Sequence, residues 1–281
     1  MQILQIPALR SPIMVAAFGG WNDAGEAATG AISHLTSMWP TTTIARVDPE
    51  EFYDFQVNRP AVFVDEAKSR QLIWPGTEIY GVETPHLPFD FILVRGIEPS
   101  MKWKNFTDDL LDLADDLDVR MVITLGSLLA DTPHSRPVPV SKSAAHAEIA
   151  ERLGVDVSDY EGPTGILGVL QDASLRRGVD AVSLWSAIPH YASLSPSPKA
   201  TLALINALED FLNISLPQGQ LPDNSKAWEM SIDELANEDS EIADYVRQLE
   251  AAKDAADLPE ATGESIAREF ERYLRRRNTE H

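Results

Sequence analysis

The chain has 281 residues, a formal net charge of −21 and a hydrophobic fraction of 44%. This length and composition suit one large folded domain with an extension, and they exclude an intrinsically disordered chain. The negative charge argues against nucleic acid as a partner, because a phosphate backbone requires a basic surface. The absence of cysteine excludes disulfides, thiolate metal sites and a cysteine nucleophile.

The first element is an apolar run from Ile13 to Phe18, which predicts a fully buried strand. The turn 19–23, GGWND, follows it and leads into a predicted helix over 24–31, for which Asn22 or Asp23 can supply the N-cap. A ligand site is expected at the carboxyl end of such a strand. The turn is acidic and has no Lys or Arg, so we do not expect it to bind phosphate. The alternative is a purely structural turn, with a helix cap and with Trp21 packed as a wedge.

Further strands and helices alternate along the chain. Apolar runs with β-branched and aromatic residues predict strands over Thr43–Val47, Ala61–Val64, Phe89–Arg95, Val119–Leu125 and Val179–Ile188. Helical spacing of apolar residues predicts helices over Asn105–Leu117, Ser143–Leu153, Pro163–Arg176 and Pro196–Leu212. This alternation predicts an α/β fold with a mixed, mainly parallel sheet that is covered by helices on both faces.

The chain changes character after Leu216. Residues 217–226 are rich in Pro, Gly, Gln and Asn and predict a linker or a surface crossing. Ser231 and Glu234 then form a candidate capping box for a helix that ends near Ala256. A last helix is predicted from Thr262 to its basic end at 275–277. We therefore expect two parts: an α/β domain over 1–216 and a helical extension over 217–281.

The loop from Leu125 to Pro139 follows the strongest central strand and holds the first catalytic candidates. It contains Ser127, Asp131, His134, Ser135 and Arg136. A His close to an Asp can act as a general base. No G-x-S-x-G elbow surrounds its serines, and its prolines equally suit a rigid packing loop.

Two more loops contribute candidates. The segment 160–168, YEGPTGILG, presents Glu161 and the free amide groups of a helix start, which suit an anion, although it also reads as an ordinary turn with Pro in the first helical turn. His190 stands at the end of the last predicted strand, where a structural role is the alternative. The complete set of ligand-binding candidates is Gly20, Asn22, Asp23, His134, Arg136, Glu161 and His190.

The sequence lacks the usual signatures of metal and cofactor sites. The six histidines form no H-x-x-x-H or H-E-x-x-H pattern, and neither a phosphate loop nor a G-x-G-x-x-G fingerprint occurs. We expect neither a metal nor a cofactor, and no catalytic residue is assigned. Without a signal peptide or a long apolar segment, a cytoplasmic protein with no membrane partner is expected.

Four segments in the same order resemble the family named for the second proteasome assembly chaperone, and in particular its long actinobacterial branch of uncharacterised proteins. These segments are FGGWNDAG, LGSLLADTPHSRP, YEGPTGILG and WSAIPHY. The resemblance implies a fold similar to nucleoside phosphorylases, homo-oligomers with a trimer as the first choice, and a proteasome-related protein partner. Proteins of this kind dock through a carboxyl terminus of hydrophobic residue, Tyr and any residue, whereas this sequence ends in 277–281, RNTEH.

Two functions follow from these observations. The leading interpretation is a cytoplasmic, non-enzymatic interaction or assembly factor of the proteasome-assembly-chaperone type. The alternative is an enzyme or small-molecule-binding protein that uses a cleft at the carboxyl edge of the sheet. A third interpretation places the same loops in an oligomer interface.

Overall fold

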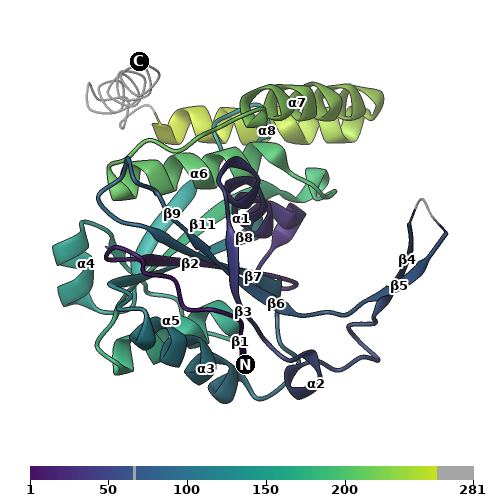
Figure 1. Ribbon diagram of the computed structural model, residues 1–281. Coiled ribbons are helices and arrows are strands. Elements are labelled where there is room, and N and C mark those ends of the chain that lie inside the picture. Colours follow the sequence, from purple (N-terminus) through teal and green to yellow (C-terminus); the bar gives the residue numbers. More distant parts are fainter. Residues whose placement is uncertain (66–67, 258–281) are drawn as a thin grey trace. The chain divides into compact units, whose positions relative to one another are not determined.

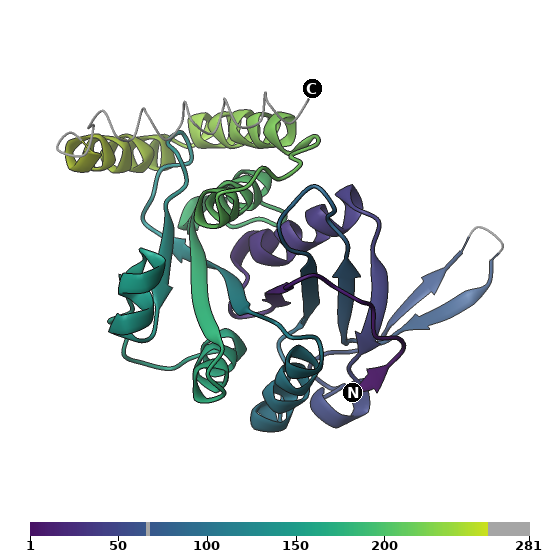
Figure 2. The same ribbon diagram turned by 60° about the vertical axis from the view of Figure 1, so that its left-hand side comes forward.

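The computed structural model describes residues 1–65 and 68–257 (Figures 1 and 2). The helix predicted from Thr262 and the carboxyl-terminal residues 277–281 lie outside the described residues. Contacts divide the chain into two compact units. The first unit holds Met1–Asp23, Ile32–Gly126 and Lys142–Ser183, and the second holds Ala24–Ala31, Ser127–Ser141 and the described chain from Leu184 onward. The boundary predicted at residue 217 stays a prediction.

Strands and helices alternate along most of the described chain. The strands are β1 (Gln2–Ile3), β2 (Ile13–Gly19), β3 (Thr42–Arg46), β4 (Ala61–Val64), β5 (Arg70–Ile73), β6 (Thr77–Val82), β7 (Phe91–Ile97), β8 (Met121–Ala130), β9 (Val140–Ala144), β10 (Asp156–Val157) and β11 (Asp180–Pro189). The α-helices are α1 (Ala27–Met38), α2 (Pro49–Phe52), α3 (Trp103–Asp116), α4 (Ala147–Leu153), α5 (Ile166–Arg176), α6 (Pro198–Leu212), α7 (Leu221–Glu238) and α8 (Ser240–Asp257). Two short 3₁₀-helices are η1 (Ala24–Glu26) and η2 (His190–Ala192).

Within the described residues, the main sheet has nine strands in the order β1-β3-β6-β7-β2-β8-β11-β9-β10. Strand β2 lies between β7 and β8 and is parallel to both, with Ile13 opposite Phe91 on one side and Met121 on the other. Strands β1, β3 and β6 form antiparallel pairs at one edge. The parallel central strands and the antiparallel pairs at one edge confirm the predicted α/β fold with a mixed sheet. The apolar run of β2 can be stable only when both faces of this sheet are covered.

Aromatic contacts in the first unit show which elements cover the two faces. Phe18 of β2 packs edge to face on Phe106 of α3, with ring centroids 5.6 Å apart. Phe91 of β7 shares the other face with Ile13 and stacks on Trp39, which follows α1, at 5.5 Å. Helical segments therefore cover both sides of the central strands, as continuous burial along β2 requires.

The helix after the first strand begins later than predicted. Residues Ala24–Glu26 form η1, in which Gly25 and Glu26 have left-handed φ values of 59° and 50°, and α1 starts only at Ala27. Neither Asn22 nor Asp23 therefore occupies the N-cap position of α1. Trp21 is 65% exposed and is not a packed wedge.

Strand pairing overrides the predicted start of the Ala-rich helix. Residues Val140–Ala144 belong to β9, where Ser143 pairs with Asp156 of β10, and α4 begins at Ala147. The predicted loop after Leu125 also starts later, because β8 continues to Ala130 and includes Ser127. Main-chain pairing with distant strands is not visible in local sequence spacing.

The predicted linker over 217–226 is partly helical. Helix α7 begins at Leu221, and Pro222 suits its first turn because that turn needs no amide hydrogen. Ser231 lies inside α7, where its hydroxyl donates to the carbonyl of Trp228 at 2.7 Å instead of capping a helix. Asp239 ends α7 and accepts the amide hydrogen of Glu241 at 2.9 Å, so it opens α8.

Candidate functional site

In the first unit, the turn after β2 meets the segment that follows β7. Gly20 has a φ of 123°, a conformation that side chains rarely adopt, and it is exposed. The amide hydrogen of Glu98 is donated to the carbonyl of Gly19 at 2.8 Å. Because β2 and β7 are parallel neighbours, their carboxyl ends place Gly20 and Glu98 side by side.

The Glu98 carboxylate joins this turn to the start of α5. Its Oε1 accepts one hydrogen bond from Nδ2 of Asn22 and another from the amide of Ile166, each at 2.8 Å. Asn22 is 1% exposed and Ile166 is fully buried. A negative group at this position also suits the partial positive charge of a helix N-terminus.

Gly165 is required by the close approach of Asn22. A Cβ atom on Gly165 would lie 2.3 to 2.7 Å from the side-chain atoms of Asn22, which is far inside van der Waals contact. Gly165 also takes the N-cap position of α5, and no side-chain hydrogen bond caps the helix from there. The Glu98 carboxylate caps the helix instead, because it accepts the amide hydrogen of Ile166.

The first unit thus brings together two of the predicted loops, the turn after β2 and the segment 160–168. At the start of α5, where anion binding is one of the two interpretations, the amide of Ile166 bonds to the carboxylate of Glu98. Glu161 is exposed and lies outside this cluster of hydrogen bonds, whereas Asp23 is buried. Sequence reasoning missed Glu98, although an acidic residue directly after a buried strand is a usable signal.

In the second unit, the loop after β8 places His134 in a buried position with only 2% exposure. The hydroxyl of Tyr191 accepts the amide hydrogen of His134 at 2.8 Å and lies 2.8 Å from Nδ1 of the ring. Nε2 lies 2.9 Å from Oδ1 of Asp233 in α7. If Tyr191 donates its hydrogen to Nδ1, the ring proton resides on Nε2 and is donated to Asp233.

The protonation of the Tyr191 hydroxyl supports its role as the donor to Nδ1 of His134. Burial raises the pKa of Tyr191 to about 12, while the amide hydrogen bond from His134 acts in the opposite direction. The hydroxyl therefore keeps its hydrogen at neutral pH and can donate it. Lys199 of α6 adds a further link, since its ammonium group donates to the carbonyl of His134 and to Glu229 of α7.

Arg136 is tied to α8. Its Nε and a terminal nitrogen donate to the two carboxylate oxygens of Asp254 at 2.7 and 2.8 Å, and Glu250 lies 3.2 Å away. The hydrogen bond with Asp254 is the main cause that raises the pKa of Arg136 above its usual value. The same pairing lowers the pKa of Asp254. Ser135 donates a short hydrogen bond to Glu250 as well.

His190 lies at the surface of the second unit. It is 3.9 Å from Asp131, which accepts a hydrogen bond from Tyr245 of α8 at 2.8 Å.

The seven candidates thus fall into two sets: Gly20, Asn22, Asp23 and Glu161 in the first unit, and His134, Arg136 and His190 in the second. A general base needs a nitrogen lone pair directed at substrate. Both ring nitrogens of His134 face protein partners, so the geometry favours a structural role for it.

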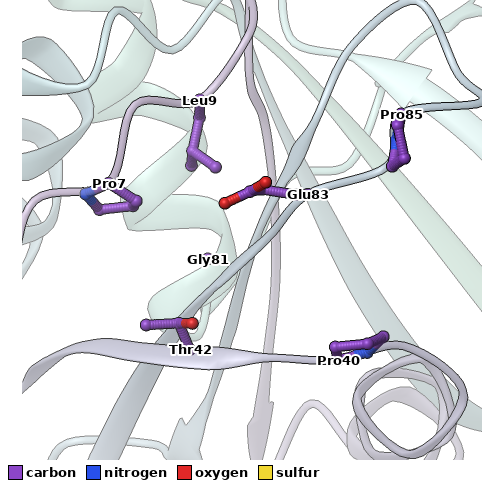
Figure 3. A pocket seen from close by; sticks show the side chains of 7 residues that line it. All are labelled: Pro7, Leu9, Pro40, Thr42, Gly81, Glu83 and Pro85. Carbon is purple, nitrogen blue, oxygen red and sulfur yellow. The ribbon is translucent and has the colours of Figure 1, made fainter.

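A cavity of about 340 Å³ lies elsewhere in the first unit (Figure 3). Its lining consists of Pro7, Leu9, Pro40, Thr42, Gly81, Glu83 and Pro85. Val82, at the end of β6, pairs with Phe91, the first residue of β7, whereas Glu98 follows the last residue of β7. The cavity therefore lies toward the amino end of β7, opposite the edge where a ligand was predicted.

Among residues 1–65 and 68–257, no group of three His, Asp or Glu side chains is arranged to hold a metal ion. No helix in the same ranges is long and apolar enough to cross a membrane.

The family of this chain follows from its similarity to known proteins. The model of the PAC2 family matches residues 17–236. The chain belongs to the PAC2 family. This match covers the turn after β2, both sets of candidate residues and most of α7.

Solved structures agree with that membership. A PAC2 family protein of Streptomyces avermitilis is 50% identical, with a TM-score of 0.78, and the match covers 84% of this chain and 99% of that one. A proteasome-assembly chaperone homologue of Mycobacterium tuberculosis is 47% identical, with a TM-score of 0.76, and the match covers 83% of this chain and 99% of that one. An archaeal proteasome activator of Pyrococcus furiosus shares the fold at 18% identity and a TM-score of 0.65. That match covers 83% of this chain and 96% of the other. No curated protein matches the chain.

Proposed function

We propose that this PAC2-family chain is an interaction or assembly factor that acts on proteasome subunits or their assembly intermediates. The observation that carries the proposal is the 47% identity, over 99% of its length, to a Mycobacterium tuberculosis protein described as a proteasome-assembly chaperone homologue. The family match over residues 17–236 supports it. The archaeal proteasome activator contributes the shared fold alone.

The geometry of the second unit favours protein binding over catalysis. His134 and Arg136, the side chains best suited to chemistry, hold the loop after β8 on helices α7 and α8. Their partners Asp233 and Asp254 are 54% exposed, so this network lies at the surface. A rigid loop braced in this way supports a fixed binding surface.

We further propose that the protein acts in the cytoplasm as a homo-oligomer, with a trimer as the first choice. The resemblance of its four sequence segments to the family supports this assignment. The net charge of −21 supports a protein partner over nucleic acid.

The test uses the purified full chain and the purified proteasome α and β subunits of the same organism. We expect the chain to form a complex with α subunits on native gels and to change the rate at which half-proteasomes form. An unrelated acidic protein of similar net charge controls for nonspecific attraction. No complex at about 50 μM, together with an unchanged assembly rate, would overturn the proposal.

A second candidate function is small-molecule binding at the turn after β2. It is favoured by the exposed Gly20 and Trp21 at the carboxyl end of β2, in a turn that the hydrogen bonds of Glu98 hold in place within the first unit. A ligand that binds the folded state raises the melting temperature, so a thermal-shift screen against metabolites tests it. The shift should shrink in Trp21→Ala, which removes an exposed side chain beside the turn and leaves the Glu98 hydrogen bonds in place. A screen with no shift contradicts this candidate.

A further inference from the structure

The cavity of about 340 Å³ in the first unit has a glycine as its floor (Figure 3). Gly81 is buried in β6, where it pairs with Thr42 of β3 on one side and with Ile92 of β7 on the other. A Cβ atom on Gly81 would lie 3.2 Å from side-chain carbons of Pro7 and Ile44, closer than ordinary contact. A glycine inside a strand often marks a place where a ligand or another segment approaches the backbone closely. Gly81 therefore leaves open a space that any other residue would fill.

The walls of this cavity are apolar and rigid. Pro7 and Leu9 are half-buried beside the floor, whereas Pro40 and Pro85 are exposed at the rim. A proline ring loses no rotamer freedom when it is covered, so a ligand that packs on these rings avoids the entropy cost of ordering side chains. Ligand pockets span about 300–1,000 Å³, and this cavity is at the small end of that range. Its size suits a small molecule rather than a large cofactor.

Glu83 gives the cavity a negative charge, and it is the only charged side chain among the described lining residues. Residues two apart on an extended segment point to the same side, so Glu83 follows Gly81 onto the cavity face. Figure 3 shows its carboxylate directed across the cavity toward Leu9. Across residues 1–65 and 68–257, no hydrogen bond or salt bridge engages this carboxylate. The carboxylate is therefore available to a ligand.

The cation nearby, Arg10, is committed to other groups. Its guanidinium donates to Asp90 at 2.7 Å and to two main-chain carbonyls. The hydrogen bond with Asp90 is the main cause that raises the pKa of Arg10, and the charge of Glu83 adds to it. Arg10 thus contributes positive potential without occupying the Glu83 carboxylate.

We propose that this cavity binds a small aliphatic cation, an ammonium or guanidinium group on a short alkyl chain. The cationic head pairs with the Glu83 carboxylate, and the hydroxyl of Thr42, on the other side of Gly81 in Figure 3, offers a second acceptor. The alkyl chain packs on Leu9 and the proline rings. A metal ion does not suit the site, because one carboxylate supplies too few oxygen ligands. The net charge of −21 attracts cations to the chain and repels anions.

The inference goes beyond the proposed assembly role and is independent of it. The cavity is also separate from the turn after β2, because it lies toward the amino end of β7 and that turn lies at the carboxyl end of β2.

The test is an NMR titration of the ¹⁵N-labelled full chain with n-butylammonium chloride at constant ionic strength. We expect saturable shifts of the backbone amide signals of Thr42 and Gly81, with a Kd of about 1–10 mM for so small a ligand. n-Butanol has the same chain without the charge, and butyrate has the opposite charge, so both should bind about fivefold more weakly or less. A peptide arm with N-acetyl-Gly-Lys-Gly-amide shows whether the site also accepts the lysine side chain of a protein.

Three variants locate the binding. Glu83→Gln should weaken n-butylammonium binding about fivefold and remove its preference over n-butanol. Glu161→Gln is the matched control, because it removes the same charge at another exposed position of the first unit and should leave binding unchanged. Trp21→Ala should also leave binding unchanged, which separates the cavity from the turn after β2. Circular dichroism checks that each variant folds.

Three results overturn the proposal. Equal affinity for n-butanol and n-butylammonium means that the cavity does not select a cation. Equal weakening in Glu83→Gln and Glu161→Gln means that the ligand follows the net charge of the chain and not this site. The absence of any saturable shift at 50 mM or so means that the cavity binds no such ligand. The proteasome proposal is unaffected by these results and is judged by its own assay.

Discussion

Replacing Glu98 with alanine tests whether this carboxylate holds the turn after β2 on helix α5. Glu98→Ala removes the acceptor of two hydrogen bonds, from Nδ2 of Asn22 and from the amide of Ile166. Both donors belong to buried residues. Each buried donor left without a partner costs about 1–3 kcal/mol. Since Glu98 itself is half-buried and water can reach part of the space it leaves, we expect a total loss of about 2–4 kcal/mol.

Glu98→Gln separates the hydrogen bonds from the charge. The amide oxygen of glutamine can still accept both bonds, while the favourable interaction of a negative charge with the α5 N-terminus is lost. That interaction is worth about 0.3–1 kcal/mol, so Glu98→Gln should be much milder than Glu98→Ala. Glu161→Ala is the matched control, because it is the same substitution at an exposed site in the preceding loop and should change stability by about 0.5 kcal/mol or less.

The assay is urea unfolding at neutral pH, followed by far-UV circular dichroism, with the free energy of unfolding taken from the midpoint and slope. A Glu98→Ala variant within about 0.5 kcal/mol of wild type refutes the reasoning, as does a Glu98→Gln variant that is equally unstable. The first result means that water replaces the carboxylate at no cost. The second means that charge, and not hydrogen bonding, is what matters.

Three further predictions concern other parts of the fold. Burial acts to raise the pKa of Asp90, but hydrogen bonds from Arg10 and from backbone amides outweigh burial and lower the pKa. The ionised carboxylate therefore stabilises the folded state, and stability should fall as the pH drops below about 4. Asp90→Asn should flatten that decline in urea titrations between pH 2 and 6 or so, and an unchanged slope contradicts the assignment. Gly96→Ala places a Cβ 2.0 Å from Oγ1 of Thr77 and should lower the free energy of unfolding, measured by thermal unfolding, by about 2 kcal/mol or more. An unchanged stability means that β6 can move away to make room for the added methyl group. His134→Ala should speed amide hydrogen exchange in α7, and unchanged exchange there means that the helix does not depend on the His134 ring.

Much of the framework could be predicted from the sequence because its signals are local. The run Ile13–Phe18 is apolar at every position, and such a segment is stable only when buried on both faces. The strands near 43–47, 89–95, 119–125 and 179–188 followed from the same reasoning, and so did the α/β class. The four quoted segments indicated the family, which the match over residues 17–236 confirms.

The errors fall where a distant partner decides the local structure. Residues 143–146 have helical composition, yet Ser143 pairs with Asp156 and lies in a strand. Ser231 satisfies the pattern of a capping box but lies within α7, since that helix begins at Leu221. A residue that can serve as a cap serves equally well inside a helix when its hydroxyl bonds back to a carbonyl, as it does to Trp228.

The sequence by itself determined the buried strand, the glycine turn after it and the family to which the chain belongs, since each is encoded in contiguous residues. Tertiary structure alone decided the role of Glu98, which caps a helix that starts far along the chain at Ile166, and the engagement of His134 by Tyr191 and Asp233. Such contacts depend on which segments the fold brings within about 3 Å, a distance that no local spacing of residues specifies.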